Sequence, residues 1–385
     1  MTVTFDMIVV GAGPAGSNAA AVALRHGLTV GQVDRYRFPR EKPCGGGITV
    51  KATNALRLDL KPALRGEFDQ VEVNVWQRSV NRFTTRPLPV LRMVVRSQFD
   101  DCLVTQNLST SGFQFFDDER VLDITYDQRF RVRTSRRVLL GRHLVGADGA
   151  YGVVNRVIPV ARPKGHAVAV EVRLGREDAT LPAPTPPCFD IGVIDWGYGW
   201  VFPKDDHWNV GLYTLSKSRT LRQQLTSYIA AKGFRLKIDP LATFVAHRFP
   251  YGGYRVSMPQ VPVYLVGDAG GFGDALTGEG IYHALESGRI AGETIYECLA
   301  GRVRAQAYYR RLRKSVLADT FTTYHLARKL YSHLESFAAL LENPRLSGPL
   351  IAGYTRGVRM AESLGPTGWL RALATRLPRL RLATR

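Results

Sequence analysis

The segment spanning residues 5–34 constrains the fold more than any other part of this 385-residue chain. It begins with an apolar run (FDMIVV), passes through the glycine-rich turn GAGPAG at residues 11–16, and enters a stretch of small residues typical of a closely packed helix. A second apolar run at residues 28–33 ends at Asp34. This order and spacing predict a Rossmann-type βαβ unit that binds a dinucleotide.

Each glycine of this turn has its own physical role. Gly11 permits the tight turn, Gly13 lets the backbone approach a pyrophosphate, and Gly16 lets helix and strand pack closely. We expect the helix N-terminus to face the phosphates and Asp34 to accept hydrogen bonds from ribose hydroxyls. The spacing alone leaves NAD and FAD both open.

Two later segments favour FAD. HLVGADG at residues 143–149 and VYLVGDAGG at residues 263–271 each end an apolar run in an acidic residue, and LTGEG follows the second at residues 276–280. FAD is long, and it needs a second carboxylate on its ribityl chain and a helix end near the flavin pyrimidine. Asp268 and residues 277–280 are placed to supply both. Taken singly, each Asp-Gly pair could be an ordinary turn.

In this order, the glycine turn and the two Asp-Gly segments resemble the hydroxylase-like superfamily of FAD-dependent enzymes. That superfamily includes aromatic hydroxylases, halogenases and prenyl reductases. Arg96, in VVRSQFDDCL, matches a position at which the superfamily places an arginine near the flavin. A salt bridge on the surface, just before a helix, is the alternative interpretation of Arg96.

The middle of the chain predicts a second structural unit. Residues 66–95 and 166–214 alternate apolar with polar residues, as antiparallel strands do when one face is wet. We expect these segments to pair into a sheet that roofs the flavin. Period-two spacing places Tyr198, Trp200 and Phe202 on one face, which would form an aromatic wall. On periodicity alone, packing of these rings into a core is the favoured interpretation.

Three motifs together resemble the geranylgeranyl reductase family: KPCGGG at residues 42–47, YGWVFP at residues 198–203, and GDAGGF with GEGI between residues 267 and 281. The resemblance covers about residues 5–300. It implies saturation of C=C bonds in an isoprenoid or similar apolar substrate by hydride transfer from N5 of reduced FAD.

The chain departs from that family at two places. Asp195 stands where a proline is frequent, and Asp274-Ala275 stands where many relatives have Asn-Pro. Residues 197–203 also loosely resemble a halogenase motif. Substrate and reaction type therefore stay open at this point.

The predicted fold is α/β, or α+β overall. It comprises a Rossmann-type FAD-binding domain interleaved with an antiparallel-sheet substrate domain, plus C-terminal helices. The expected boundaries are 1–65, 96–160 and 255–300 for the FAD-binding domain, 66–95 and 161–254 for the substrate domain, and 301–385 for a basic helical region.

The predicted site combines catalytic, substrate and FAD contacts, with no metal. Cys44, Tyr198 and Trp200 are the predicted catalytic residues; Cys44 and Tyr198 are candidate proton donors, with a bound water as an equal alternative. Predicted substrate contacts are Gly47, Tyr198, Trp200, Phe202 and Pro203. Predicted FAD contacts are Gly11, Gly13, Ala15, Gly16, Asp34, Arg35, Cys44, Gly45, Gly46, Arg96, Val121, Asp148, Gly267, Asp268, Gly278, Gly280 and Ile281.

Two other functions fit the same motifs. One is an oxygen-dependent monooxygenase or halogenase acting on an aromatic or polyketide-type substrate, for which Lys42 and Lys204 would be the lysines of interest. The other is a non-catalytic flavin-binding or lipid-binding protein. Only one GxGxxG occurs, so NADPH docking transiently, a ferredoxin or a separate reductase are the candidate electron donors.

The charge distribution bears on location and partners. The net charge is +19, and residues 301–385 hold 16 Lys and Arg against 4 Asp and Glu. Residues 369–380 place apolar side chains at helical spacing between arginines, which fits a helix in a membrane interface or one packed on the protein itself. We expect a cytoplasmic protein, with peripheral contact at the inner membrane surface as an open alternative, and no nucleic-acid partner.

Overall fold

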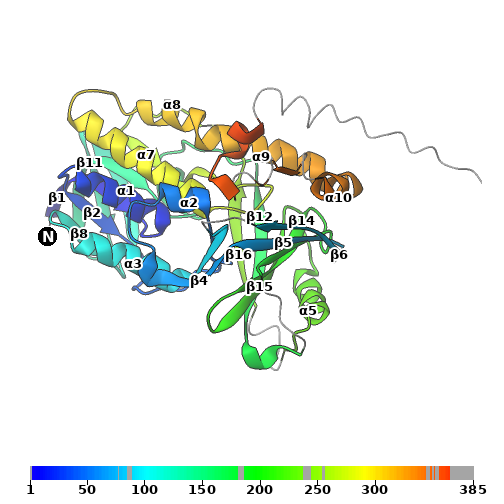
Figure 1. Ribbon diagram of the computed structural model, residues 1–385. Coiled ribbons are helices and arrows are strands. Elements are labelled where there is room, and N and C mark those ends of the chain that lie inside the picture. The colour runs from blue at the N-terminus through cyan, green and yellow to red at the C-terminus, as the bar shows by residue number, and fades with distance from the viewer. Residues whose placement is uncertain are drawn as a thin grey trace, which may run out of the picture.

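The computed structural model describes residues 2–76, 78–84, 89–180, 186–236, 244–253, 256–343, 347–348, 351 and 355–364. An α/β unit and an antiparallel sheet lie next to one another, and the chain passes repeatedly between them (Figure 1). The predicted α/β and α+β fold class is confirmed.

The sheet of the α/β unit has the strand order β8-β2-β1-β11-β10-β9, with β17 also paired to β11. Strands β1 and β11 are apolar and almost wholly buried in their second halves, as expected for parallel strands covered on both faces. The strands are β1 (Thr2–Val10), β2 (Val30–Val33), β8 (Phe113–Phe116), β9 (Val121–Asp127), β10 (Arg129–Thr134), β11 (Val138–Gly146) and β17 (Val263–Leu265).

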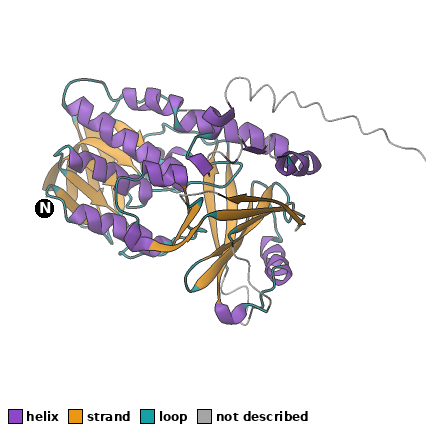
Figure 2. Ribbon diagram, viewed as in Figure 1, coloured by secondary structure: helices purple, strands orange, loops and turns teal. Residues whose placement is uncertain are grey.

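Small residues let two helices of this unit pack closely. They are α1 (Pro14–Arg25) and α7 (Ile281–Leu299), which lie side by side in Figure 2, while α3 (Arg96–Leu108) contacts α1. A Cβ at Gly288 of α7 would lie 2.3 Å from the carbonyl oxygen of Ala15 in α1. Because a side chain there would clash with backbone, glycine at this position sets the helix separation.

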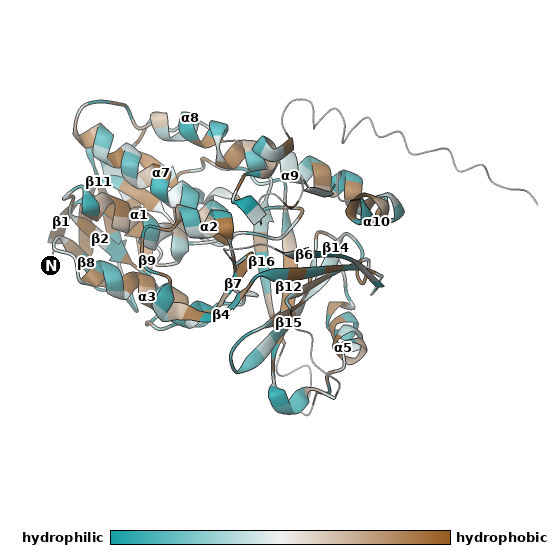
Figure 3. Cartoon of the chain, in the orientation of Figure 1, coloured by the Kyte–Doolittle hydropathy of each residue, from teal (hydrophilic) through white to brown (hydrophobic). Residues whose placement is uncertain are grey.

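The antiparallel sheet has the order β16-β12-β15-β14-β13-β5-β6. Its β14 is buried at every position, because α5 (Leu221–Ala231) covers the face opposite the aromatic side chains. The prediction of one wet face is therefore wrong for β14. The strands of this sheet carry both hydrophilic and hydrophobic residues (Figure 3), so their hydropathy did not indicate this burial. The strands are β5 (Gln70–Val75), β6 (Arg78–Thr84), β12 (Gly165–Gly175), β13 (Cys188–Ile191), β14 (Gly197–Pro203), β15 (His207–Thr214) and β16 (Val245–Tyr251).

A third sheet of three strands joins the two units. It has the order β3 (Gly47–Thr49), β7 (Leu91–Val94), β4 (Leu64–Phe68). The expectation that residues 66–95 pair into the sheet of residues 166–214 thus holds for β5 and β6 but not for β4 and β7. Alternation predicts a strand without specifying its partner. The short elements are α2 (Val50–Ala55), η1 (Lys61–Ala63), α4 (Val154–Val157), η2 (Arg176–Asp178) and η3 (Gly267–Gly270).

The described C-terminal helices belong to both cores rather than to a separate unit. In α8 (Ala307–Lys314), the hydroxyls of Tyr308 and Tyr309 donate to the carbonyl oxygens of Leu265 (2.6 Å) and Val263 (2.8 Å) on β17. Helices α9 (Val316–Tyr331) and α10 (Leu334–Glu342) contribute apolar side chains to the core beneath the antiparallel sheet. The amphipathic stretch predicted at residues 369–380 lies outside the described residues.

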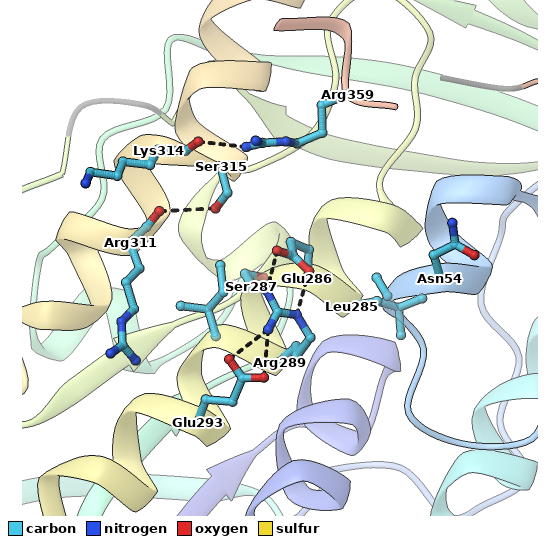
Figure 4. Close-up of polar contacts among 12 residues, drawn as sticks. Asn54, Leu285, Glu286, Ser287, Arg289, Glu293, Arg311, Lys314, Ser315 and Arg359 are labelled. Carbon is cyan, nitrogen blue, oxygen red and sulfur yellow. Dashed lines mark hydrogen bonds and ion pairs between the residues drawn. The ribbon is translucent and has the colours of Figure 1, made fainter. Parts of the chain in front are cut away.

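Polar contacts hold the last described segment against these helices. The Arg359 guanidinium donates to the Lys314 carbonyl oxygen at 2.7 Å (Figure 4). Figure 4 also shows Arg289, which forms ion pairs with Glu286 and Glu293 within α7. No helix within the described ranges is both long and apolar enough to cross a bilayer.

A buried histidine makes stability depend on pH. Burial, aided by Arg142, lowers the pKa of His143 to about 4, and its Nδ1 lies 3.0 Å from the Tyr264 hydroxyl. Because the pKa of His143 is lower in the folded state, the unfolded chain binds a proton at this histidine first as the pH is lowered. The free energy of unfolding therefore decreases as the pH falls from about 6.5 to about 4. We expect His143→Gln to flatten that part of the profile, measured as melting temperature against pH. A slope equal to that of the wild type would contradict the assignment.

Candidate active site

One cavity of about 600 Å³ lies between the α/β unit and the antiparallel sheet. Its volume is within the range of small-molecule and cofactor sites. The cavity gathers nearly all of the residues predicted from the sequence. Those in its lining are Gly11, Gly13, Ala15, Asp34, Arg35, Cys44, Gly45, Gly46, Gly47, Arg96, Val121, Asp148, Tyr198, Trp200, Phe202, Gly267, Asp268, Gly278, Gly280 and Ile281.

Two predicted residues do not line the cavity. Gly16 is buried inside α1, where a Cβ would lie 2.2 Å from the Gly11 carbonyl oxygen, so its role is to hold the turn together. Pro203 ends β14 and is buried beside the cavity rather than in its wall.

The glycine turn forms one end of the cavity. Gly11 has a φ of +105°, and a Cβ there would lie 2.2 Å from the Ala147 carbonyl oxygen on the neighbouring strand end. Gly13 caps α1 without a side-chain hydrogen bond, which leaves the first N–H groups of the helix available to a ligand. The guanidinium nitrogens of Arg40 and Arg96 would lie 3.5 and 3.9 Å from a Cβ at Gly13. Positive charge therefore adjoins the turn where phosphates would bind.

Arg96 is buried, not exposed as one interpretation expected. It forms two hydrogen bonds of 2.8 Å to Asp100, and Arg40 reaches the same carboxylate at 3.0 Å. The ion pair thus exists, but its arginine also lines the cavity. Arg40 was not predicted from the sequence.

Asp34 and Asp148 are both tied to nearby backbone. Asp34 accepts the N–H groups of Ala12 (2.8 Å) and Tyr36 (3.0 Å). Asp148 accepts those of Val153 and Val154 through Oδ2, while its buried Oδ1 has no partner among the described residues. Burial raises the pKa of Asp148 despite these hydrogen bonds.

The segment between β17 and α7 contributes a charged pair and a helix N-terminus to the cavity. Asp268 lies 3.3 Å from Lys42 Nζ and 3.7 Å from His247 Nε2. Burial alone would raise the pKa of Asp268, but Lys42 and His247 together hold it well below its usual range. Gly278 has a φ of +68°, and Gly280 caps α7 without a side-chain hydrogen bond. A second uncapped helix N-terminus therefore faces the cavity.

Behind this turn lies a buried charged network, which we call the Lys51 network. Lys51 Nζ lies 2.8 Å from Glu279 Oε2 and 3.6 Å from Asp319 Oδ2. The Thr49 hydroxyl donates to Glu279 at 2.6 Å, and His283 Nε2 lies 3.1 Å from Asp319. The network connects the cavity turn to α9, and no motif in the sequence indicated it.

The loop at residues 42–47 is clamped to the antiparallel sheet. Glu171 of β12 accepts the Cys44 N–H at 2.9 Å, and Lys204 Nζ donates to the Gly45 carbonyl oxygen at 2.9 Å. A Cβ at Gly45 would lie 2.9 Å from the Phe202 ring. The glycines therefore let the loop pack directly against the aromatic face of β14.

Six aromatic side chains form the other end of the cavity. The face predicted for Tyr198, Trp200 and Phe202 is extended by neighbours on β13, β15 and β16. Trp200 packs directly against Gly211, where a Cβ would lie 2.2 Å from the indole. The Tyr198 hydroxyl donates to the Thr277 carbonyl oxygen, and Trp200 Nε1 donates to Asn209 at 2.7 Å. The aromatic wall consists of Phe189, Tyr198, Trp200, Phe202, Tyr213 and Phe249.

Sequence reasoning missed Glu171, Arg40 and three of the aromatic residues. For Glu171 a signal existed: in HAVAVEVRL it shares its period-two face with Ala167 and Ala169. The alternate residues Val170 and Val172 pack with α5 on the other face. A carboxylate on the cavity face of a strand is a candidate functional group.

This arrangement fits FAD. The cavity would suit an anionic, elongated dinucleotide for three reasons. Two uncapped helix N-termini face it, arginines lie beside the phosphate turn, and its glycines stand where a Cβ would clash with neighbouring atoms. A family model described as "FAD binding domain" matches residues 4–189. The class of protein is therefore an FAD-dependent oxidoreductase, and the predicted cofactor is confirmed.

Relatives narrow this class. The chain is 32% identical to an uncharacterized protein of Methanosarcina barkeri, over 93% of this chain and 92% of that protein. It is 30% identical to a menaquinone reductase of Mycobacterium tuberculosis, over 92% and 89%. It is 29% identical to the chloroplastic geranylgeranyl diphosphate reductase of Nicotiana tabacum, over 75% and 65%.

Solved structures agree on the fold. A geranylgeranyl bacteriochlorophyll reductase-like protein of Thermoplasma acidophilum superposes with a TM-score of 0.78 at 19% identity, over 98% of both chains. The flavin-dependent brominase Bmp2 superposes at 0.71 with 18% identity, over 96% and 97%. The chain belongs to the geranylgeranyl reductase family of FAD-dependent oxidoreductases.

Proposed function

We propose that this protein saturates C=C bonds in the isoprenoid chain of an apolar substrate, using electrons from reduced FAD. The observation that carries the proposal is the continuity of one cavity, which runs from the nucleotide turn at Gly11 to a wall of six aromatic rings. Relatives described as menaquinone reductase and geranylgeranyl diphosphate reductase support the same substrate class. When bound and reduced, FAD supplies a hydride.

The residues of this chain would bind and orient the substrate. The aromatic wall offers flat apolar surface and excludes water, which positions an alkene that has no carbonyl to polarise. The N–H groups at the start of α7 would stabilise negative charge at the adjoining end of the cofactor. Positioning and charge stabilisation are thus supplied by separate elements.

The oxygen-dependent alternative has less support. The Lys42 ammonium is paired with Asp268, and Lys204 donates to the Gly45 carbonyl oxygen, so both lysines of interest are engaged in structural contacts. Likeness to a brominase at 18% identity reflects the fold. Monooxygenase or halogenase activity is therefore the alternative result that the experiment below can detect.

The test is an anaerobic reaction of dithionite-reduced protein with geranylgeranyl diphosphate and, separately, with menaquinone. We expect products whose mass is raised by two hydrogens for each double bond reduced. Oxygen uptake that depends on an aromatic substrate, with no hydrogenated product, would instead identify the monooxygenase or halogenase. Reduced FAD that reacts with neither would favour the non-catalytic binding protein.

The partners are also proposals. We propose that NADPH, a ferredoxin or a separate reductase reduces FAD, and that the substrate is drawn from a lipid surface at the cytoplasmic side of a membrane. The rate at which NADPH reduces bound FAD after rapid mixing shows whether NADPH is the donor; a very slow rate would favour a ferredoxin or a separate reductase. Binding to vesicles of anionic lipid, with and without residues 367–385, tests the surface contact.

A further inference from the structure

Seven carboxyl groups line the cavity, but the antiparallel sheet contributes only one of those within the described residues, Glu171. Glu171 is 5% exposed, and it lies on the same face of β12 as Ala169, next to the aromatic wall. Its Oε1 accepts the Cys44 N–H at 2.9 Å, and the Asn209 side chain is hydrogen-bonded to the same carboxyl. Asn209 in turn accepts from Trp200, so Glu171 is fixed between the glycine loop and the wall.

We propose that Glu171 is the acid that delivers the proton in the reduction of the double bond, an inference that rests on the proposed function. Saturating one C=C breaks the π bond and forms two C–H bonds. Bound reduced FAD would supply the hydride for one carbon, and with it both electrons of the reduction. The O–H bond of the Glu171 carboxyl breaks to give the proton to the other carbon, and the resulting carboxylate regains a proton from water.

Three of the four other candidate donors are engaged elsewhere. The Tyr198 hydroxyl donates to a backbone carbonyl. Cys44 Sγ accepts the Gly46 N–H at 3.4 Å, a contact that leaves its S–H able to donate, so a Glu171→Gln rate close to that of the wild type would point to Cys44. Asp268 is held as a carboxylate by Lys42, and Glu279 is held by Lys51. Glu171 is the carboxyl placed against the apolar wall.

The surroundings of Glu171 favour a protonated carboxyl. Burial raises its pKa, against the opposing effects of the Cys44 N–H, Asn209, Lys204 and Arg173. Burial also lowers the pKa of Lys204 to about 8, so the Lys204 ammonium is charged at neutral pH and is one of these opposing effects. The remaining charged groups facing this region are engaged: Arg173 with Glu41, and His247 and Lys42 with Asp268.

Glu171→Gln separates proton delivery from a purely structural role. The amide oxygen still accepts the Cys44 N–H, so loop position, FAD affinity and melting temperature are expected to match the wild type. Alkene reduction in a single anaerobic turnover is expected to slow by about 100-fold or more, the usual contribution of a positioned acid. Glu177→Gln, an exposed carboxyl in η2, is the matched control and should leave the rate unchanged.

A second readout does not depend on turnover. Infrared difference spectra of the FAD-bound protein across a pH titration should show the band of a protonated carboxyl, absent in Glu171→Gln. A Glu171→Gln rate within about twofold of wild type, or no difference in that band, overturns the proposal while leaving the reductase function intact. A wild-type protein that forms no hydrogenated product overturns both.

Discussion

Replacing Lys51 with methionine is expected to lower the free energy of unfolding by about 3–5 kcal/mol and to release FAD. Lys51 is 5% exposed, and its ammonium lies between the carboxylates of Glu279 and Asp319. Burial alone would lower its pKa, but these carboxylates raise it well above the usual value. Methionine fills a similar volume without the charge, so two buried carboxylates lose their counter-ion. Because Glu279 belongs to the turn that lines the cavity, the damage reaches the cofactor site.

Urea unfolding and FAD titration measure the two effects. Lys61→Met, at an exposed lysine of η1, is the matched control and should change unfolding by less than about 0.5 kcal/mol. Adding Glu279→Gln to Lys51→Met should recover part of the loss, since it removes one of the unpaired charges. A Lys51→Met protein as stable as the control would show that the Lys51 network contributes no net stability.

Replacing Gly46 with alanine is expected to weaken FAD binding by about tenfold or more, which corresponds to about 1.4 kcal/mol or more. Gly46 has a φ of +73°, and a Cβ there would lie 2.0 Å from the Val94 carbonyl oxygen. The carbonyl belongs to β7, whose Val94 N–H is itself bonded to the Gly46 carbonyl oxygen at 2.9 Å. The loop must therefore shift, and its contacts with Glu171 and Lys204 shift with it.

The neighbouring glycine provides the control for this variant. A Cβ at Gly47 would meet Leu91 at 3.4 Å and Phe202 at 3.5 Å, which are ordinary contacts. Gly47→Ala is therefore expected to retain FAD affinity within about threefold of the wild type. Equal FAD affinities for the two variants, measured by fluorescence titration, would contradict the role assigned to the Gly46 backbone.

The nucleotide half of the site was predictable because its chemistry is written in local spacing. A turn such as residues 11–16 fixes backbone geometry within a few residues, and Asp34 and Asp268 each lie just after a strand, β2 and β17. The aromatic face of β14 was also visible, since alternation specifies which side chains share a face. The burial of its opposite face by α5 was not visible, because alternation specifies which side chains share a face and not what packs against it.

Local patterns in the sequence were sufficient to predict the βαβ unit and a dinucleotide ligand, since glycine spacing and acidic strand ends impose local geometry that only a few ligands fit. Two later acidic segments favoured FAD, and the family was indicated by the resemblance of three motifs. Which polar and charged groups pair with one another depended on the folding of the whole chain. Cys44 and Glu171 are 127 residues apart, and Thr49 and Glu279 are 230 apart. Buried charges require partners wherever the fold brings them together, and no local pattern encodes that pairing. The clamp on the glycine loop, the Lys51 network and the acid against the aromatic wall therefore emerged only from the folded chain.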